Sequence, residues 1–115
     1  MSAVSNSPIR SKSFQFVCDI VIYTKTLKNK REYEIASQLL KSGTSIGANV
    51  REAQRGVSRK DFKNKLGIAL KEADETLYWL ELIDATIEKT PENLSANCEE
   101  LIRILVSILK NTKIE

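Results

Sequence analysis

The strongest constraint on the fold is an apolar spacing that continues through a glycine- and serine-rich stretch, residues 38–56, QLLKSGTSIGANVREAQRG. The composition of this stretch is typical of a loop. Nevertheless, Leu39, Ser42 and Ile46 keep one helical phase through it, and a loop has no reason to preserve that phase. Each interior glycine costs a helix about 1 kcal/mol relative to alanine, so close packing of another helix must offset that cost. The stretch therefore predicts a buried, tightly packed helix.

Three further segments show the same periodicity. The predicted helices cover approximately residues 11–28, 33–55, 58–89 and 91–111. Because the connections between them are short, the chain predicts an all-α fold, an antiparallel up-down-up-down four-helix bundle. The bundle domain should occupy residues 11–112, and residues 1–10 should form a flexible N-terminal tail.

Three residues between the segments have the character of helix ends. Gly56 fits the left-handed conformation that commonly follows a helix. Ser58 is suited to cap the third helix, and Thr90 to cap the fourth, ahead of Pro91.

More residues are apolar than one buried face per helix requires. In the first helix, Phe16 and Tyr23 belong to a second apolar face, and in the third, Trp79 and Leu82 lie opposite the main apolar face. Burial on two sides indicates contact between subunits, so these four residues are predicted to form a homo-oligomer interface. For Trp79, half-burial against a neighbouring helix of the same chain is an equally consistent alternative.

Charge is divided unevenly along the chain. The formal net charge is +3, but residues 1–71 carry +9 and residues 72–115 carry −6. Such asymmetry indicates either an anion-binding face or complementary faces within an oligomer.

Basic side chains gather at both ends of the predicted bundle. Around the turn between the second and third helices lie Arg51, Arg55, Arg59, Lys60, Lys63 and Lys65. Around the turn between the first and second helices lie Lys25, Lys28, Lys30 and Arg31. The first group is a candidate nucleic-acid-binding surface, since repeated phosphate contacts give salt-dependent binding without reading sequence. The alternative is an ordinary solvated surface, and no aromatic residue interleaves the group in sequence as a stacking platform.

A polar stripe flanks the apolar face of the second helix. Its members are Gln38, Ser45, Asn49 and Glu52. They could line an anion or metal site, or they could form a buried hydrogen-bond network that fixes the register of the helices or the geometry of the subunits. One carboxylate among amides and hydroxyls is a poor ligand set, so we predict the structural network.

The sequence lacks the residues that several kinds of catalytic and metal-binding site require. The chain has no histidine and only two cysteines, Cys18 and Cys98, far apart in apolar patterns, which excludes histidine catalysis and a structural zinc site. No phosphate-cradling loop motif follows the glycines. We expect no catalytic residue, no metal and no cofactor, and therefore no enzyme. No segment has the length of a signal peptide or of a membrane span, so a cytoplasmic protein that contacts no membrane is expected.

One segment, residues 42–53 (SGTSIGANVREA), resembles the four helix bundle protein family that includes the proteins encoded by intervening sequences of bacterial 23S rRNA genes. Gln38 and Leu39 before it, and Asp61, Phe62 and Ala69 after it, extend the resemblance. The chain departs from the family pattern at residues 54–56, where its glycine comes later. The resemblance implies bacterial origin, a homo-oligomer, namely a pentameric ring, and a role described through ribosomal RNA. The family is related to the accessory proteins of diversity-generating retroelements. Those proteins are similar helical bundles that partner a reverse transcriptase and nucleic acid.

Together these features predict a non-enzymatic, oligomeric helical-bundle protein that binds RNA or a ribonucleoprotein through basic patches. The alternative is a protein–protein interaction scaffold, or an accessory subunit, with no direct nucleic-acid contact. No small-molecule substrate is indicated.

Overall fold

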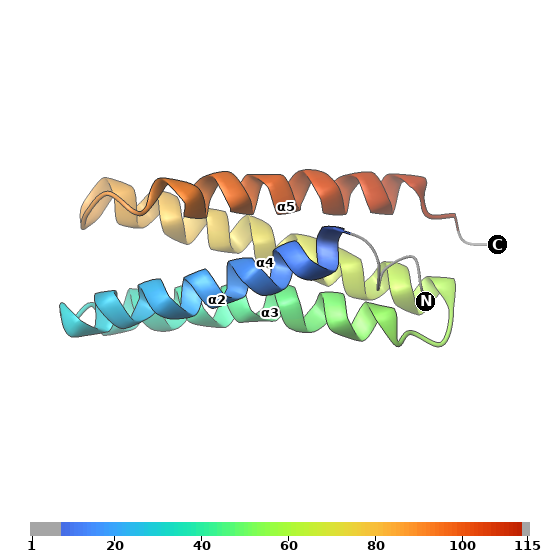
Figure 1. Ribbon diagram of the computed structural model, residues 1–115, viewed down its shortest axis with the longest axis horizontal. Helices are drawn as coiled ribbons and strands as arrows, with labels where there is room; N and C mark the ends of the chain where they lie inside the picture. Colours follow the sequence, from blue (N-terminus) through green and yellow to red (C-terminus); the bar gives the residue numbers. More distant parts are fainter. Residues whose placement is uncertain (1–7, 114–115) are drawn as a thin grey trace.

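In the computed structural model, which describes residues 8–113, four helices lie side by side in an elongated bundle (Figure 1). The helices, labelled as in Figure 1, are α2 (Pro8–Asn29), α3 (Tyr33–Gln54), α4 (Arg59–Thr86) and α5 (Glu92–Asn111). Their connections lie at alternating ends of the bundle (Figure 1), whose extents are 49 × 20 × 20 Å. The predicted all-α fold of four helices is confirmed over the described residues.

Helix α3 is the centre of the packing, because its contacts with α4 and with α2 are the most extensive between any two elements. Leu39, Ser42 and Ile46 are fully buried on its inner face. A Cβ atom added to Gly43 would lie 2.8 Å from Cγ2 of Ile20 on α2. The glycine therefore permits a close approach that any side chain would prevent, as the opening stretch of the sequence predicted.

The first helix begins earlier than the sequence indicated. α2 starts at Pro8, so residues 8–10 belong to the bundle and not to a tail. Proline is tolerated in the first turn of a helix, where its missing N–H leaves no bond unmade. Ile9 then becomes fully buried, which extends the core by one helical turn. The remainder of the predicted tail, residues 1–7, lies outside the described residues.

The expected left-handed glycine is not present. Gly56 has a negative φ, and in the described part of the chain the residue with positive φ is Arg31, at 66°, between α2 and α3. Gly56 is instead a point of close approach, where an added Cβ would lie 2.8 Å from a carboxylate oxygen of Asp61. Ser58 caps α4 as predicted, since its hydroxyl accepts the backbone N–H of Asp61 at 3.0 Å.

The second prediction about a helix end is wrong as well. Thr90 does not cap α5, whose N-cap is Pro91 and has no side-chain hydrogen bond. The backbone N–H and the hydroxyl of Thr90 both donate to Oδ1 of Asp84, at 2.7 and 2.9 Å. Because α4 ends at Thr86, this carboxylate holds the α4–α5 turn against the last part of α4.

The structure also corrects the predicted oligomer interface. Phe16 is 1% exposed and Tyr23 is 6% exposed, so both belong to the core of the protomer and cannot form a subunit contact. The outward side of α2 is the other apolar face, which begins at Phe14, 61% exposed. The sequence contained both faces, but the packing of α2 against α3 and α5 determines which one is buried.

Candidate nucleic-acid interface

The predicted basic cluster lies at the end of the bundle where α3 turns into α4. Arg51 is in the last turn of α3, and Arg59 and Lys60 open α4 after the Ser58 cap. Arg51, Arg55, Arg59 and Lys60 are exposed, whereas Lys63 and Lys65 are partly buried. The turn therefore brings the six predicted side chains to one end of the molecule.

These cations differ in whether the protein already neutralises them. Nζ of Lys65 forms an ion pair with a carboxylate oxygen of Glu52 at 2.8 Å, and this hydrogen bond raises the pKa of Lys65. Within the described residues, Arg51, Arg55 and Lys60 have no ion pair or hydrogen bond from their side chains. An exposed cation without a protein partner can neutralise an RNA phosphate and release the counterion condensed on it. These three residues are therefore the strongest candidates for phosphate contacts.

The basic group at the opposite end is partly neutralised by Glu88. This carboxylate accepts hydrogen bonds from the Lys30 ammonium and, at 2.9 Å, from the Tyr23 hydroxyl. The bond from Lys30 and then that from Tyr23 lower the pKa of Glu88. Burial and the contact with Glu88 raise the pKa of the Tyr23 phenol. Lys25, Lys28 and Arg31 remain exposed.

The predicted polar network is not formed within the protomer. Gln38 is exposed, and Glu52 points to Lys65 on α4. The hydroxyl of Ser45 donates to the Lys41 carbonyl at 2.8 Å, and the Asn49 amide donates to the Ser45 carbonyl at 2.8 Å. Ser and Asn side chains on a partly exposed helix face satisfy themselves on their own backbone one turn earlier, so no partner from another helix is required.

The buried polar contact of this region is instead between Ser42 and Thr76, both fully buried. The Thr76 hydroxyl donates to the Ser42 hydroxyl at 2.9 Å, and the Ser42 hydroxyl donates to the Leu39 carbonyl at 3.3 Å. This pair joins α3 to α4. The sequence indicated that Ser42 is buried, because it falls at an apolar position of the helical repeat between Leu39 and Ile46.

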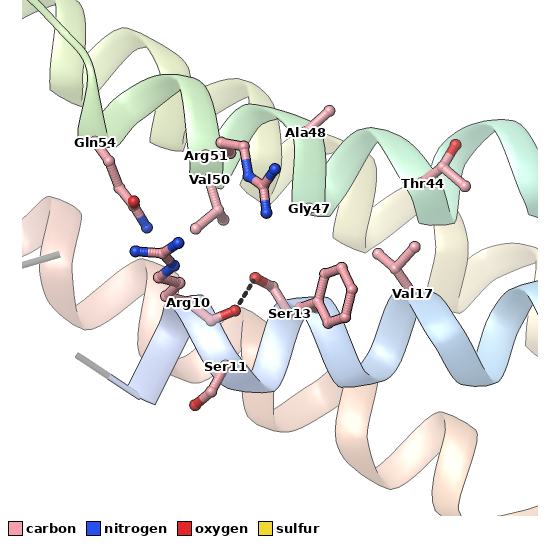
Figure 2. Close-up of a pocket in the computed structure, with 11 residues that line it drawn as sticks. Arg10, Ser11, Ser13, Val17, Thr44, Gly47, Ala48, Val50, Arg51 and Gln54 are labelled. Atoms are coloured by element: carbon pink, nitrogen blue, oxygen red, sulfur yellow. Dashed lines mark hydrogen bonds between the residues drawn. The ribbon is translucent and has the colours of Figure 1, made fainter. Parts of the chain in front are cut away.

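A groove beside the basic cluster was not predicted from sequence. It lies between α2 and α3, has a volume of about 670 Å³, and is lined among others by Phe14 and Val17 from α2 and by Gly47 from α3. Arg10 and Arg51 also line it, and Figure 2 shows their guanidinium groups directed into the space between the two helices. Phe14 is thus an aromatic residue next to the cluster in space, although it is remote in sequence.

The remaining predicted interface residues, Trp79 and Leu82, line a second groove at the other end of α3. Trp79 is partly buried against the core, and its ring lies edge-to-face with that of Tyr78, with centroids 5.1 Å apart. Tyr33, 57% exposed, lines the same groove. Trp79 thus shows the half-burial that the sequence allowed, beside a groove of mixed apolar and polar lining that the protomer leaves open.

Both cysteines are free thiols. Cys98 is buried and donates to the Ala73 carbonyl at 3.3 Å, and burial raises its pKa to about 12. Over residues 8–113 there is no group of three or more His, Cys, Asp or Glu side chains that could hold a metal ion. No helix within that range combines the length and hydropathy needed to cross a membrane.

Comparison with known proteins identifies the family. Residues 5–107 match the model of the 23S rRNA-intervening sequence protein family. Comparison with curated proteins gave no match. The fold is similar to the crystal structure of a protein with unknown function from the S23 ribosomal protein family of Bacteroides thetaiotaomicron, with a TM-score of 0.85 and 46% sequence identity. That similarity covers 90% of this chain and 99% of the other. The chain therefore belongs to the 23S rRNA-intervening sequence protein family.

Proposed function

We propose that this protein is a non-enzymatic, cytoplasmic RNA-binding protein whose principal contact surface is the basic end at the α3–α4 turn. The observation that carries the proposal is the set of exposed cations that have no partner among residues 8–113, namely Arg51, Arg55 and Lys60. The family name, which refers to a 23S rRNA intervening sequence, supports RNA as the polyanion.

The geometry supports backbone contacts in preference to base-specific ones. The cations project from the end of one helix, the start of the next and the turn between them, so they form a compact patch and not a helix face that fits a groove. Such a patch binds backbone phosphates electrostatically and does not read the bases. Its affinity for RNA depends on the release of counterions from the phosphates.

Binding of a structured RNA hairpin across a salt series tests the proposal. The logarithm of the binding constant should fall linearly with the logarithm of the salt concentration, with a slope of about −0.7 to −0.9 for each phosphate contacted. The double variant Arg55→Ala/Lys60→Ala should reduce the slope by about two such contacts.

A charge-matched control is available on the side of the bundle. Lys71 on α4 and Arg103 on α5 are exposed and unpaired within the described residues, so Lys71→Ala/Arg103→Ala removes the same charge elsewhere. Equal effects of the two double variants, or an affinity without any salt slope, would contradict a localised RNA surface.

We further propose that the up-down-up-down protomers assemble into a pentameric ring through the groove lined by Trp79, Leu82 and Tyr33. Partly open aromatic and aliphatic side chains of this kind are characteristic of interface cores. Light scattering measures the mass directly. Leu82→Lys should give monomers and shift the Trp79 emission to the red, whereas Ile22→Lys, at an exposed apolar residue of α2, should leave the mass unchanged.

The alternative function is a scaffold or accessory subunit, for example one that serves a reverse transcriptase, with no RNA contact of its own. The open groove at Trp79, which combines aromatic and aliphatic side chains with charged ones, favours it, since such a surface also suits a different protein. A partner that remains bound after nuclease treatment in high salt, with no RNA affinity of the purified protein, would support this alternative.

A further inference from the structure

The groove between α2 and α3 combines two features that the rest of the basic end lacks. Its walls are apolar, with Phe14 and Val17 on one side and Val50 on the other. At Gly47 the two helices approach closely, since an added Cβ would lie only 3.0 Å from Cγ2 of Val17. A volume of about 670 Å³ lies within the range of small-ligand sites, which extends from roughly 300 to 1,000 Å³.

The two charged side chains that line the groove, Arg10 and Arg51, are both cationic. Arg10 and Arg51 face the space from opposite helices (Figure 2), and no carboxylate is among its lining residues. Neither guanidinium has an ion pair or hydrogen bond with a described residue. A purely apolar occupant would bury these charges without partners, which is strongly unfavourable. An occupant that carries both an apolar surface and an anion would match the walls and the two arginines together.

We infer that this groove binds an unpaired nucleotide of RNA, with the base against Phe14 and the flanking phosphates on Arg10 and Arg51. The inference rests on the proposed RNA-binding function and assigns a site within it. Phe14 is 61% exposed, so its ring is available for stacking. Stacking on an aromatic side chain is the usual way in which proteins hold unstacked RNA bases, and Arg supplies the phosphate contacts.

The arrangement also selects the form of the RNA. Within a duplex, both faces of each interior base are covered by neighbouring bases, so away from the duplex ends Phe14 has no face to stack on. Single-stranded segments, loops and bulges present free base faces. The basic end should then bind any RNA through phosphates, whereas the groove should add affinity for unpaired nucleotides only.

The test compares a labelled short oligouridylate with a blunt RNA duplex carrying the same number of phosphates. Phe14→Ala should weaken oligouridylate binding at least about fivefold and change duplex binding less than about twofold, since each stacked base contributes substantially. Phe14→Tyr should retain the wild-type affinity. The matched control is Ile22→Ala on the same helix, whose side chain is 63% exposed and lies outside the groove.

A second measurement reports contact with the ring itself. In a Trp79→Phe background, Phe14→Trp places the single tryptophan in the groove, and stacking of a base on it should quench its fluorescence. Quenching by oligouridylate but not by duplex supports the inference.

The outcomes separate the groove from the wider function. If the duplex binds with a salt slope and Phe14→Ala leaves oligouridylate binding unchanged, the groove assignment is overturned while the proposed function stands. If neither RNA binds, both fail. If Phe14→Ala changes the mass in light scattering and not the RNA affinity, the groove is a contact with a second copy of the chain and the inference is overturned.

Discussion

One carboxylate joins the end of α2 to the turn that follows α4. Glu88 accepts hydrogen bonds from both Tyr23 and Lys30, and these bonds lower its pKa. A carboxyl group whose pKa is lower in the folded state stabilises the protein above its ordinary pKa. That contribution is lost as the pH falls through the lowered value.

At the residue scale, Glu88→Gln should destabilise the protein at neutral pH by about 0.5 kcal/mol, because the ion pair with Lys30 is partly exposed. The difference from wild type should shrink as the pH falls through the folded-state pKa of Glu88. Urea unfolding at a series of pH values measures both. In a Lys30→Met background the pH-dependent part should be smaller, and an unchanged pH profile there would contradict the assigned cause.

At the scale of elements, the contact between α2 and α3 depends on a missing side chain. Gly43 lies against Ile20, which is fully buried and branched at Cβ, so its methyl group cannot easily move aside. Gly67 on α4 is different, since an added Cβ there would meet no atom within 4 Å.

The two glycines should therefore respond oppositely to the same change. Gly67→Ala should stabilise the protein by up to about 1 kcal/mol through helix propensity. Gly43→Ala gains the same propensity but overpacks the interface by roughly 1 to 3 kcal/mol, so it should be net destabilising. The free energies of unfolding of the two variants and of the wild type should be measured by urea denaturation at one fixed protomer concentration. Two changes of the same sign would mean that α2 moves away from α3 at little cost.

At the scale of the whole molecule, the charge division of the sequence becomes a distribution in space. Glu52 neutralises one cation of the basic cluster, because it forms an ion pair with Lys65 across the α3–α4 turn. Lys65 therefore contributes less to a phosphate-binding surface than its neighbours do.

Removing that carboxylate should strengthen RNA binding. Glu52→Gln frees Lys65, so affinity should rise at low salt and the salt slope should steepen by about 0.7 to 0.9. The control is Glu92→Gln, which makes the same change of net charge in the Lys89–Glu92 pair at the start of α5. A gain that is equal in both variants would show that net charge, and not the position of Lys65, sets the affinity.

The family resemblance, the four helices and most of their buried faces could be predicted from residue order. Helical periodicity depends on neighbours one turn away, and the unbroken phase of α3 through its glycines indicated a close helix contact before any partner was known. The Ser58 cap was predictable for the same reason, because it depends on residues only three positions apart.

Long-range packing was needed for the rest. Two apolar faces on α2 are equivalent in sequence, and contact with α3 and α5 buries the one with Phe16 and Tyr23 while leaving Phe14 outside. The same contact places Phe14 beside Arg51, 37 positions later in the chain. Glu52 meets Lys65 only because α4 folds back along α3. Periodicity defines faces, but the partner of each face depends on contacts between residues that are distant in the chain.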